Sequence, residues 1–249
     1  MGILEYNYLI ICIILYISMQ FVESISFSAK IAGKLTDNLS SGVTIQHTIY
    51  QTSRIFLPFL LLFLSFLIET GLSLIKFLLL AFLSTFFAFT LSFISLRLVN
   101  NFQILFQKIF LNIKFRSLPI AIIQALFSKR TYETLLNFEF NISSKYINFK
   151  KVVASCFAYT FLSTGFFLSF TLAILNPEYR MTASQLTTVF HGFGALFLAF
   201  YIDPMLSKSL DNKFNSEHWV LNFYSIYLGR MLAYLLSSIG FLIFYLLNL

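Results

Sequence analysis

Six long apolar stretches dominate this chain and limit what it can fold into. They cover residues 8–30, 45–68, 72–96, 151–175, 183–202 and 223–247. A helix needs about 20 mostly apolar residues to cross the hydrocarbon core of a bilayer. Of the 249 residues 58% are hydrophobic and 11% are charged, whereas soluble domains carry roughly 25% charged residues. We therefore predict an all-α, polytopic membrane protein with one integral membrane domain over residues 1–249. A cytosolic or nucleic-acid-binding globule is excluded.

The connection between the third and fourth stretches, residues 97–150, has a different character. Within it, residues 102–115 place apolar side chains at intervals of three and four, which predicts an amphipathic helix lying in the membrane surface. Cations are concentrated here and at the start of the fourth stretch: Arg97, Lys108, Lys114, Arg116, Lys129, Arg130, Lys145, Lys150 and Lys151. Basic loops stay in the cytoplasm and attract anionic lipids. We therefore expect a cytoplasmic connection, and alternation of the spans places both termini outside the cytoplasm.

Three ionisable side chains, Glu23, Arg54 and Arg230, fall well inside predicted spans, and His191 is a further candidate. Such groups cost roughly 2.5–3.5 kcal/mol on insertion scales and usually face a protein interior or a transport pathway. At 3.6 residues per turn, His47 and Gln51 share one helix face with Arg54. Two interpretations stay open. Glu23 and Arg54 neutralise each other and hold the helices together, or they belong to a cationic cavity that faces an anionic head group.

A second polar group lies between the fourth and fifth stretches. Asn176-Pro177 predicts the end of a helix, and Thr182 or Ser184 is expected to cap the next one. Arg180 stands beside that helix start, where a phosphate oxygen would be well placed. A plain capped turn is the alternative. Asp203-Pro204 predicts a comparable break after the fifth helix.

Common catalytic and nucleotide-binding motifs are absent from the sequence. There is no Walker-type phosphate loop, no dinucleotide fingerprint, no His-Glu-x-x-His and no Gly-x-Ser-x-Gly. The three histidines are scattered, and Cys12 and Cys156 lie within apolar runs. We therefore expect a protein that is not an enzyme and that has no metal or cofactor site.

Four polar segments carry a family resemblance. They are Glu23–Gly33, Thr52–Arg54, Asn176–Leu186 and Asp203–Ser207. In this order they resemble the alternate lipid II flippase family, Amj, and the third segment is the most specific. The resemblance spans about residues 20–65 and 150–245. The chain departs from the family pattern at residues 46–47 and 50–51, where aliphatic residues are expected, and at residues 191–192.

The resemblance implies a six-span protein of the bacterial inner membrane. It also implies that this protein moves an undecaprenyl-pyrophosphate-linked peptidoglycan precursor, lipid II, to the outer leaflet for cell wall biogenesis and cell shape, without hydrolysing ATP. The polar residues that match the family are Glu23, Lys30, Arg54, Asn176, Glu178, Arg180, Gln185, Asp203 and Ser207. From the polar groups and the resemblance together, we predict a set of substrate-binding residues. They are Glu23, Lys30, Gln51, Arg54, Arg180, Gln185, Asp203 and Arg230.

Two other classes of function are compatible with the same composition. A non-transporting membrane subunit of a larger complex would use Glu23 and Arg54 as a structural pair. An ion or small-solute channel would use the polar face of the second span as a pore lining. The sequence does not define the oligomeric state.

Overall fold

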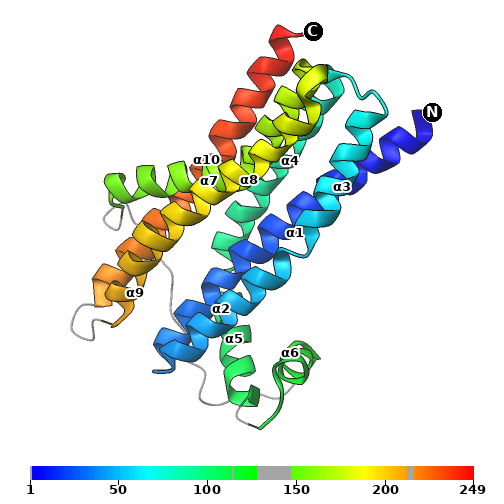
Figure 1. Ribbon diagram of the computed structural model, residues 1–249. Helices are drawn as coiled ribbons and strands as arrows, with labels where there is room; N and C mark the ends of the chain where they lie inside the picture. Colours follow the sequence, from blue (N-terminus) through cyan, green and yellow to red (C-terminus); the bar gives the residue numbers. More distant parts are fainter. Residues whose placement is uncertain (1, 114, 128–146, 212–215) are drawn as a thin grey trace. The chain divides into compact units, whose positions relative to one another are not determined.

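The structure is a computed structural model that describes residues 2–113, 115–127, 147–211 and 216–249. The described part of the chain is helical apart from short turns, and it contains no strand. In chain order the elements are α1 (Gly2–Leu35), α2 (Leu39–Ser53), α3 (Phe56–Glu69), α4 (Leu74–Arg97), α5 (Val99–Ile113), α6 (Leu118–Phe127), α7 (Phe149–Leu175), η2 (Pro177–Tyr179), α8 (Arg180–Phe197), η3 (Leu198–Ile202), α9 (Asp203–Asp211) and α10 (Ser216–Leu247) (Figure 1). The predicted all-α fold is confirmed.

Six helical segments in the described residues are long and apolar enough to cross a membrane. They are Glu5–Leu35, Leu39–Glu69, Leu74–Arg97, Phe149–Leu175, Pro177–Ser209 and Trp219–Leu247. Helices satisfy their backbone hydrogen bonds internally, as a segment in hydrocarbon must. The prediction of six spans is confirmed, and the observed helices extend beyond the predicted apolar stretches at most of their ends.

The chain divides into two compact units, which we describe separately. The first unit comprises Met1–Gln20, Phe56–Leu91 and Ile142–Leu249, and the second comprises Phe21–Ile55 and Ser92–Asn141. The helices α1 and α4 each contribute residues to both units. One integral membrane domain over the whole chain stays a prediction.

In the first unit, α8 and α10 both pack along α7 (Figure 1). Glycines permit this close approach. A Cβ atom at Gly194 of α8 would lie 2.8 Å from the backbone nitrogen of Leu162, and one at Gly229 of α10 would overlap the carbonyl oxygen of Val152. The hydroxyl of Ser155 also donates to the carbonyl of Ile226 at 2.7 Å. Small residues bring membrane helices together in this way because lipid offers no hydrophobic driving force for helix association.

In the second unit, α1 and α2 form a tight helical hairpin. The chain reverses at Asp37, which has a φ of 51°. A Cβ atom at Gly42 would lie 2.8 Å from the carbonyl oxygen of Ala29 and 2.9 Å from the Cα of Gly33. The helices α5 and α6 of the same unit share a small apolar core with this hairpin. Its buried residues are Ala29, Ala32, Ile45, Phe106, Ile109, Phe110, Ala121 and Ala125.

The second span is broken in the structure, where the sequence indicated one continuous helix. Arg54 and Ile55, between α2 and α3, form a turn in which their N–H groups donate to carbonyls three residues earlier, at 3.1 Å, in place of the α-helical pattern. Pro58 explains the position of the break, because proline has no N–H to donate to the carbonyl of Arg54, four residues earlier. Arg54 is thus placed at a helix end inside a span.

The predicted amphipathic helix exists as α5, but its two faces were assigned wrongly in part. Gln103 and Gln107 are polar residues between the apolar positions of this pattern, so it assigns them to the polar side, but both are buried together with Phe106. The apolar side of α5 packs against protein, so a position in the membrane surface stays a prediction. The apolar helix α6 within the polar connection was not predicted. Residues 128–146, which include three of the cations counted above, lie outside the described residues.

Two boundaries around α8 also differ from expectation. Neither Thr182 nor Ser184 caps the helix, because α8 already begins at Arg180, and the Ser184 hydroxyl donates to the carbonyl of Met181 at 2.8 Å. Asp203-Pro204 does not break the chain. A π-helical turn, η3, precedes it, and the N–H of Asp203 reaches back to the carbonyl of Leu198. The wider turn accommodates the proline without ending the helical segment.

Candidate functional site

A charged pair inside the second unit combines two of the predicted site residues. The Nε atom of Arg54 lies 3.3 Å from Oε1 of Glu23, and their side chains are 15% and 4% exposed. Glu23 comes from the middle of α1 and Arg54 directly follows α2. The hydroxyl of Ser53 is 3.4 Å from the same Oε1 atom. The α1–α2 hairpin therefore brings together an acid and a base that are 31 positions apart.

Tyr50 gives Arg54 a second partner. It lies one helical turn before Arg54, its hydroxyl accepts a hydrogen bond from the guanidinium, and the guanidinium carbon lies 4.5 Å from the centre of its ring. A cation over an aromatic face is stabilised by the ring quadrupole, by more where water is excluded. The guanidinium of Arg54 thus contacts both the carboxylate of Glu23 and the side chain of Tyr50.

Around Glu23, α1 carries further buried polar side chains. Lys30 is 2% exposed. The Ser24 hydroxyl lies 3.2 Å from that of Ser92 on α4, and the Ser26 hydroxyl donates to the carbonyl of Glu23 at 2.7 Å. The α1–α2 hairpin thus carries two cations, the buried Lys30 and the half-buried Arg54, near buried hydroxyl groups and the buried carboxylate of Glu23.

Gln51 does not join this cluster. It is exposed, as is His47, and both line an open depression of about 640 Å³ on α2. The threonines beside them, at positions 44, 48 and 52, donate their hydroxyls to carbonyls of the preceding turn at 2.8–2.9 Å. This face therefore presents few unsatisfied polar groups besides His47 and Gln51 themselves.

Arg230 lies in the first unit and is 1% exposed. Its Nε donates to the hydroxyl of Tyr234 at 2.7 Å, and its terminal nitrogen donates to the side chain and the backbone carbonyl of Gln20 at 3.0 and 3.2 Å. Tyr234 in turn donates to Gln20. The Tyr159 ring lies 5.0 Å from the guanidinium carbon. Protein groups thus already contact the guanidinium of Arg230, which we predicted to bind substrate.

Arg180 stands at the start of α8, also in the first unit. One terminal nitrogen lies 3.5 Å from the carbonyl oxygen of Ile68, in the last turn of α3. A cation at a helix C-terminus is favourable because it compensates the dipole and an orphan carbonyl. The Nε atom of Arg180 is buried and has no hydrogen-bond partner among the described residues. The side chain of Arg180 therefore caps the C-terminus of α3, and its Nε–H group makes no hydrogen bond with the described residues.

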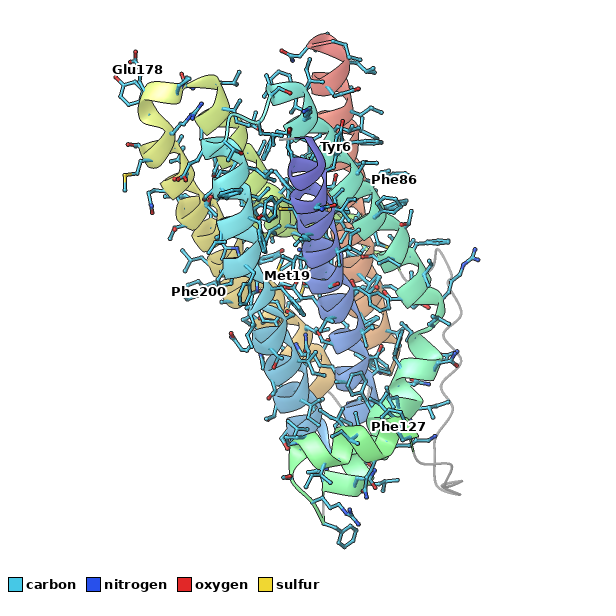
Figure 2. The ribbon with its side chains drawn as sticks, turned by 90° about the vertical axis from the view of Figure 1, so that its right-hand side faces the viewer. Tyr6, Met19, Phe86, Phe127, Glu178 and Phe200 are labelled. Atoms are coloured by element: carbon cyan, nitrogen blue, oxygen red, sulfur yellow. The ribbon has the colours of Figure 1, made fainter. Side chains whose placement is uncertain are left out.

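The structure does not gather the remaining predicted residues around Arg180. Gln185 is exposed on α8 and Asp203 is half-buried at the start of α9. At 1.5 Å per residue, the 23 residues from Arg180 to Asp203 separate the two by about 35 Å along the helical segment. Figure 2 shows Glu178 at the turn between α7 and α8, pointing away from the helices.

Sequence reasoning missed the partners of Arg230. Tyr234 could have been predicted from the sequence, because a spacing of four residues places Tyr234 on the same helix face as Arg230. Gln20 is 210 positions away, and no local pattern marks it. In the described residues, no group of three or more His, Cys, Asp or Glu side chains is arranged to hold a metal ion.

Comparison with known proteins gives one result. A family model described as Amj, Alternate to MurJ, matches residues 15–244. The matched range includes the Glu23–Arg54 pair, Arg180 and Arg230. No curated protein and no solved structure matches the chain.

Proposed function

The chain belongs to the Amj family, and on that basis we propose that it is a flippase. Its substrate would be lipid II, the peptidoglycan precursor linked to undecaprenyl pyrophosphate, which it would carry from the inner to the outer leaflet of the bacterial inner membrane. The membrane-spanning helices and the family description, an alternate to MurJ, support this proposal. The protein would serve cell wall biogenesis and cell shape as a transporter and not as an enzyme.

The observation that carries the proposal is the Glu23–Arg54 contact within membrane-spanning helices. A pyrophosphate-linked sugar head group is anionic and rich in hydroxyls, and its transfer into hydrocarbon is prohibitive without polar and cationic partners. Arg54 and the buried Lys30 bring two positive charges, and the serines of α1 bring hydroxyls. A guanidinium suits this substrate because it binds phosphate oxygens in a planar, two-bond geometry.

We assign Glu23 the role of a place-holder for the substrate anion. A buried guanidinium without a counter-charge costs several kcal/mol, so Arg54 needs an anionic partner before substrate arrives. In the proposed exchange, a pyrophosphate oxygen replaces the carboxylate beside Arg54, and the carboxylate returns when the lipid leaves. The exchange of one anion for another requires no ATP hydrolysis.

The other predicted ligands receive separate roles in this proposal. Arg180, with its unused Nε donor, contacts the head group at the outer face together with Gln185. The half-buried Asp203 and the exposed Gln51 contact sugar or peptide groups. Arg230 reaches phosphate only if Gln20 and Tyr234 release it, so its contacts favour a structural role.

The proposed orientation follows from the distribution of cations. The basic connection at residues 97–150 faces the cytoplasm and its anionic lipids, and both termini face outward. In a background without Cys12 and Cys156, Leu249→Cys is expected to react with a membrane-impermeant maleimide added to spheroplasts, whereas Arg116→Cys reacts only after lysis. The reverse pattern would contradict the orientation.

Reconstitution tests the proposed function against both alternatives. The purified chain is placed in liposomes that carry fluorescent lipid II, and an impermeant quencher measures the fraction in the outer leaflet over time. A flippase moves the label faster than protein-free liposomes do. Leakage of small ions without movement of lipid would indicate a channel. Neither activity would indicate a subunit that needs partners.

A further inference from the structure

A large apolar cavity, open on one side, lies in the first unit between α7, α8 and α10, and four of its lining leucines, at positions 168, 172, 175 and 236, are exposed. Its volume is about 700 Å³. Its walls run along α7 from Thr160 to Leu175 and along α10 from Leu236 to Phe244, and Phe190 of α8 closes one side. None of the charged clusters described above contributes a side chain to it.

Two glycines on α10 show how the cavity arises. Gly229 and Gly240 are 11 residues apart, which is about three helical turns, so they lie on the same face of α10. At Gly229 this face contacts the α7 backbone so closely that a Cβ atom would collide with it, whereas at Gly240 nothing lies within 4 Å of a Cβ position. The space between α7 and α10 therefore widens toward the C-terminal end of α10.

The hydroxyl groups along the wall are already satisfied. Thr160, Thr164 and Thr171 each donate to the carbonyl of the residue four positions earlier, at 2.8, 2.6 and 2.8 Å. No residue that lines the cavity carries a charge. A cavity of this kind offers nothing to an ion or a sugar, and it suits a hydrocarbon chain that fills it through dispersion contacts.

The dimensions suit a chain rather than a compact ligand. The α7 wall extends over 16 residues, from Thr160 to Leu175, and the 15 helical steps between these two residues span about 22 Å at 1.5 Å each. A bilayer core is about 30 Å thick. Because every wall belongs to a membrane-spanning helix, the ligand enters from the hydrocarbon of the bilayer.

We propose that this cavity binds the isoprenoid tail of a polyprenyl-linked lipid. The choice of isoprenoid over a phospholipid acyl chain rests on the proposed function. The wall agrees with it, because Phe190, Phe241 and Phe244 present flat rings that pack against double bonds and methyl branches by dispersion. The tail is thereby held by protein during translocation and does not move freely in the bilayer.

Photocrosslinking tests the site without requiring transport. The purified chain in nanodiscs is irradiated with a polyprenyl monophosphate that carries a diazirine in its tail, and the labelled residues are mapped by mass spectrometry. We expect labels on the α7 and α10 walls and competition by unlabelled polyprenyl phosphate. Gly240→Phe fills the open space and is expected to reduce the labelling about tenfold or more, the factor that corresponds to the loss of a modest apolar contact.

Gly192→Phe provides the matched control. Gly192 also has nothing within 4 Å of a Cβ position, but it does not line the cavity, so its variant is expected to label like the wild type. Should Gly240→Phe fail to accumulate, Ser237→Leu narrows the same cavity from α10. Absence of labelling on the walls, or equal labelling of both phenylalanine variants, would overturn the proposal.

Two further outcomes would overturn it in other ways. A diazirine phospholipid that labels the walls as strongly and resists competition by polyprenyl phosphate would indicate a general acyl-chain groove. Crosslinks between two chains at the walls would indicate that a second copy covers them.

Labelling by the polyprenyl probe in a chain that fails to move lipid II would keep this site and reject the proposed function. Lipid II movement without labelling would do the opposite.

Discussion

Arg54 and Glu23 meet at 3.3 Å, between Nε of the guanidinium and Oε1 of the carboxylate, although they stand at different points of the α1–α2 hairpin. The contact is compatible with a structural pair and with a substrate site. The two roles differ in what happens when both charges are removed together. A structural pair is replaceable by apolar side chains, since the removal of both buried charges is often neutral for stability. A phosphate ligand is not replaceable.

Removal of one partner of the pair should destabilise the fold. In Arg54→Leu the Glu23 carboxylate loses this cation in a buried setting, and we expect the free energy of unfolding to fall by up to about 3 kcal/mol. The double variant Glu23→Leu/Arg54→Leu should recover most of the loss. Thermal unfolding in detergent measures the loss in the single variant and the recovery in the double variant.

The Glu5–Lys76 pair is the control for this cycle. Its side chains are 24% and 43% exposed, so Lys76→Leu is expected to change the unfolding midpoint little. A double variant at Glu23 and Arg54 that is as unstable as the worse single variant would contradict the pairing.

The close approach of α1 and α2 should not tolerate a side chain at Gly42. A Cβ atom there would meet the Ala29 carbonyl at 2.8 Å, so Gly42→Val must separate the hairpin, at a cost of about 1–3 kcal/mol. Gly192→Val changes helix propensity equally but enters open space. The yield of monodisperse protein on size exclusion compares them. Equal yields would show that the hairpin is looser than the structure places it.

Much of the fold was predictable because a span must be long and apolar. Each of the six stretches became a helical segment of membrane length for that reason, although the second is divided between α2 and α3. The break at Arg54 could have been inferred from Pro58, since the missing N–H falls four residues later. By contrast, Pro204 suggested a break that a π-helical turn absorbs, and a turn of this kind depends on packing that local sequence does not reveal.

The buried arginine of α10 should depend on its glutamine partner. Gln20 accepts hydrogen bonds from Arg230 at 3.0 and 3.2 Å, and Gln20→Leu removes the side-chain acceptor. We expect the free energy of unfolding to fall by about 1–3 kcal/mol, the cost of an unsatisfied buried donor. Gln51→Leu, at an exposed glutamine of α2, should have little effect. If chemical denaturation gives the same free energy of unfolding for Gln20→Leu and Gln51→Leu, the hydrogen bonds from Arg230 to Gln20 do not stabilise the fold.

Two variants of Arg180 should distinguish a role in helix capping from a role in substrate binding. Arg180→Lys keeps a cation near the carbonyl of Ile68, so the unfolding midpoint is expected to stay close to that of the wild type. Arg180→Ala loses about 0.3–1 kcal/mol. Transport should fall in both, because lysine lacks the planar fork. Glu178→Ala, at the exposed turn nearby, serves as the control.

Wild-type transport by Arg180→Lys would leave Arg180 with the capping role alone. The lipid II assay in liposomes, normalised to the amount of reconstituted protein, provides the measurement.

The candidate site was only partly accessible from sequence. Glu23 and Arg54 were identified because charges inside apolar spans are rare, and their pairing was one of two interpretations. Gln51 was assigned to the same face as Arg54 by helical spacing, yet the helix ends at Ser53 and Gln51 is exposed. The burial of Gln103 and Gln107 depends on α6 and the α1–α2 hairpin as partners, and a periodicity within one helix does not indicate which partners it meets.

The most direct test of the central claim compares lipid II translocation by the wild type and by Glu23→Leu/Arg54→Leu in the same liposomes. The double variant is expected to fold with a near-normal unfolding midpoint but to translocate at least about tenfold more slowly, since a charge-assisted contact worth about 1.5–3 kcal/mol is lost. Translocation by the double variant at the wild-type rate would contradict a role for Arg54 in carrying the pyrophosphate.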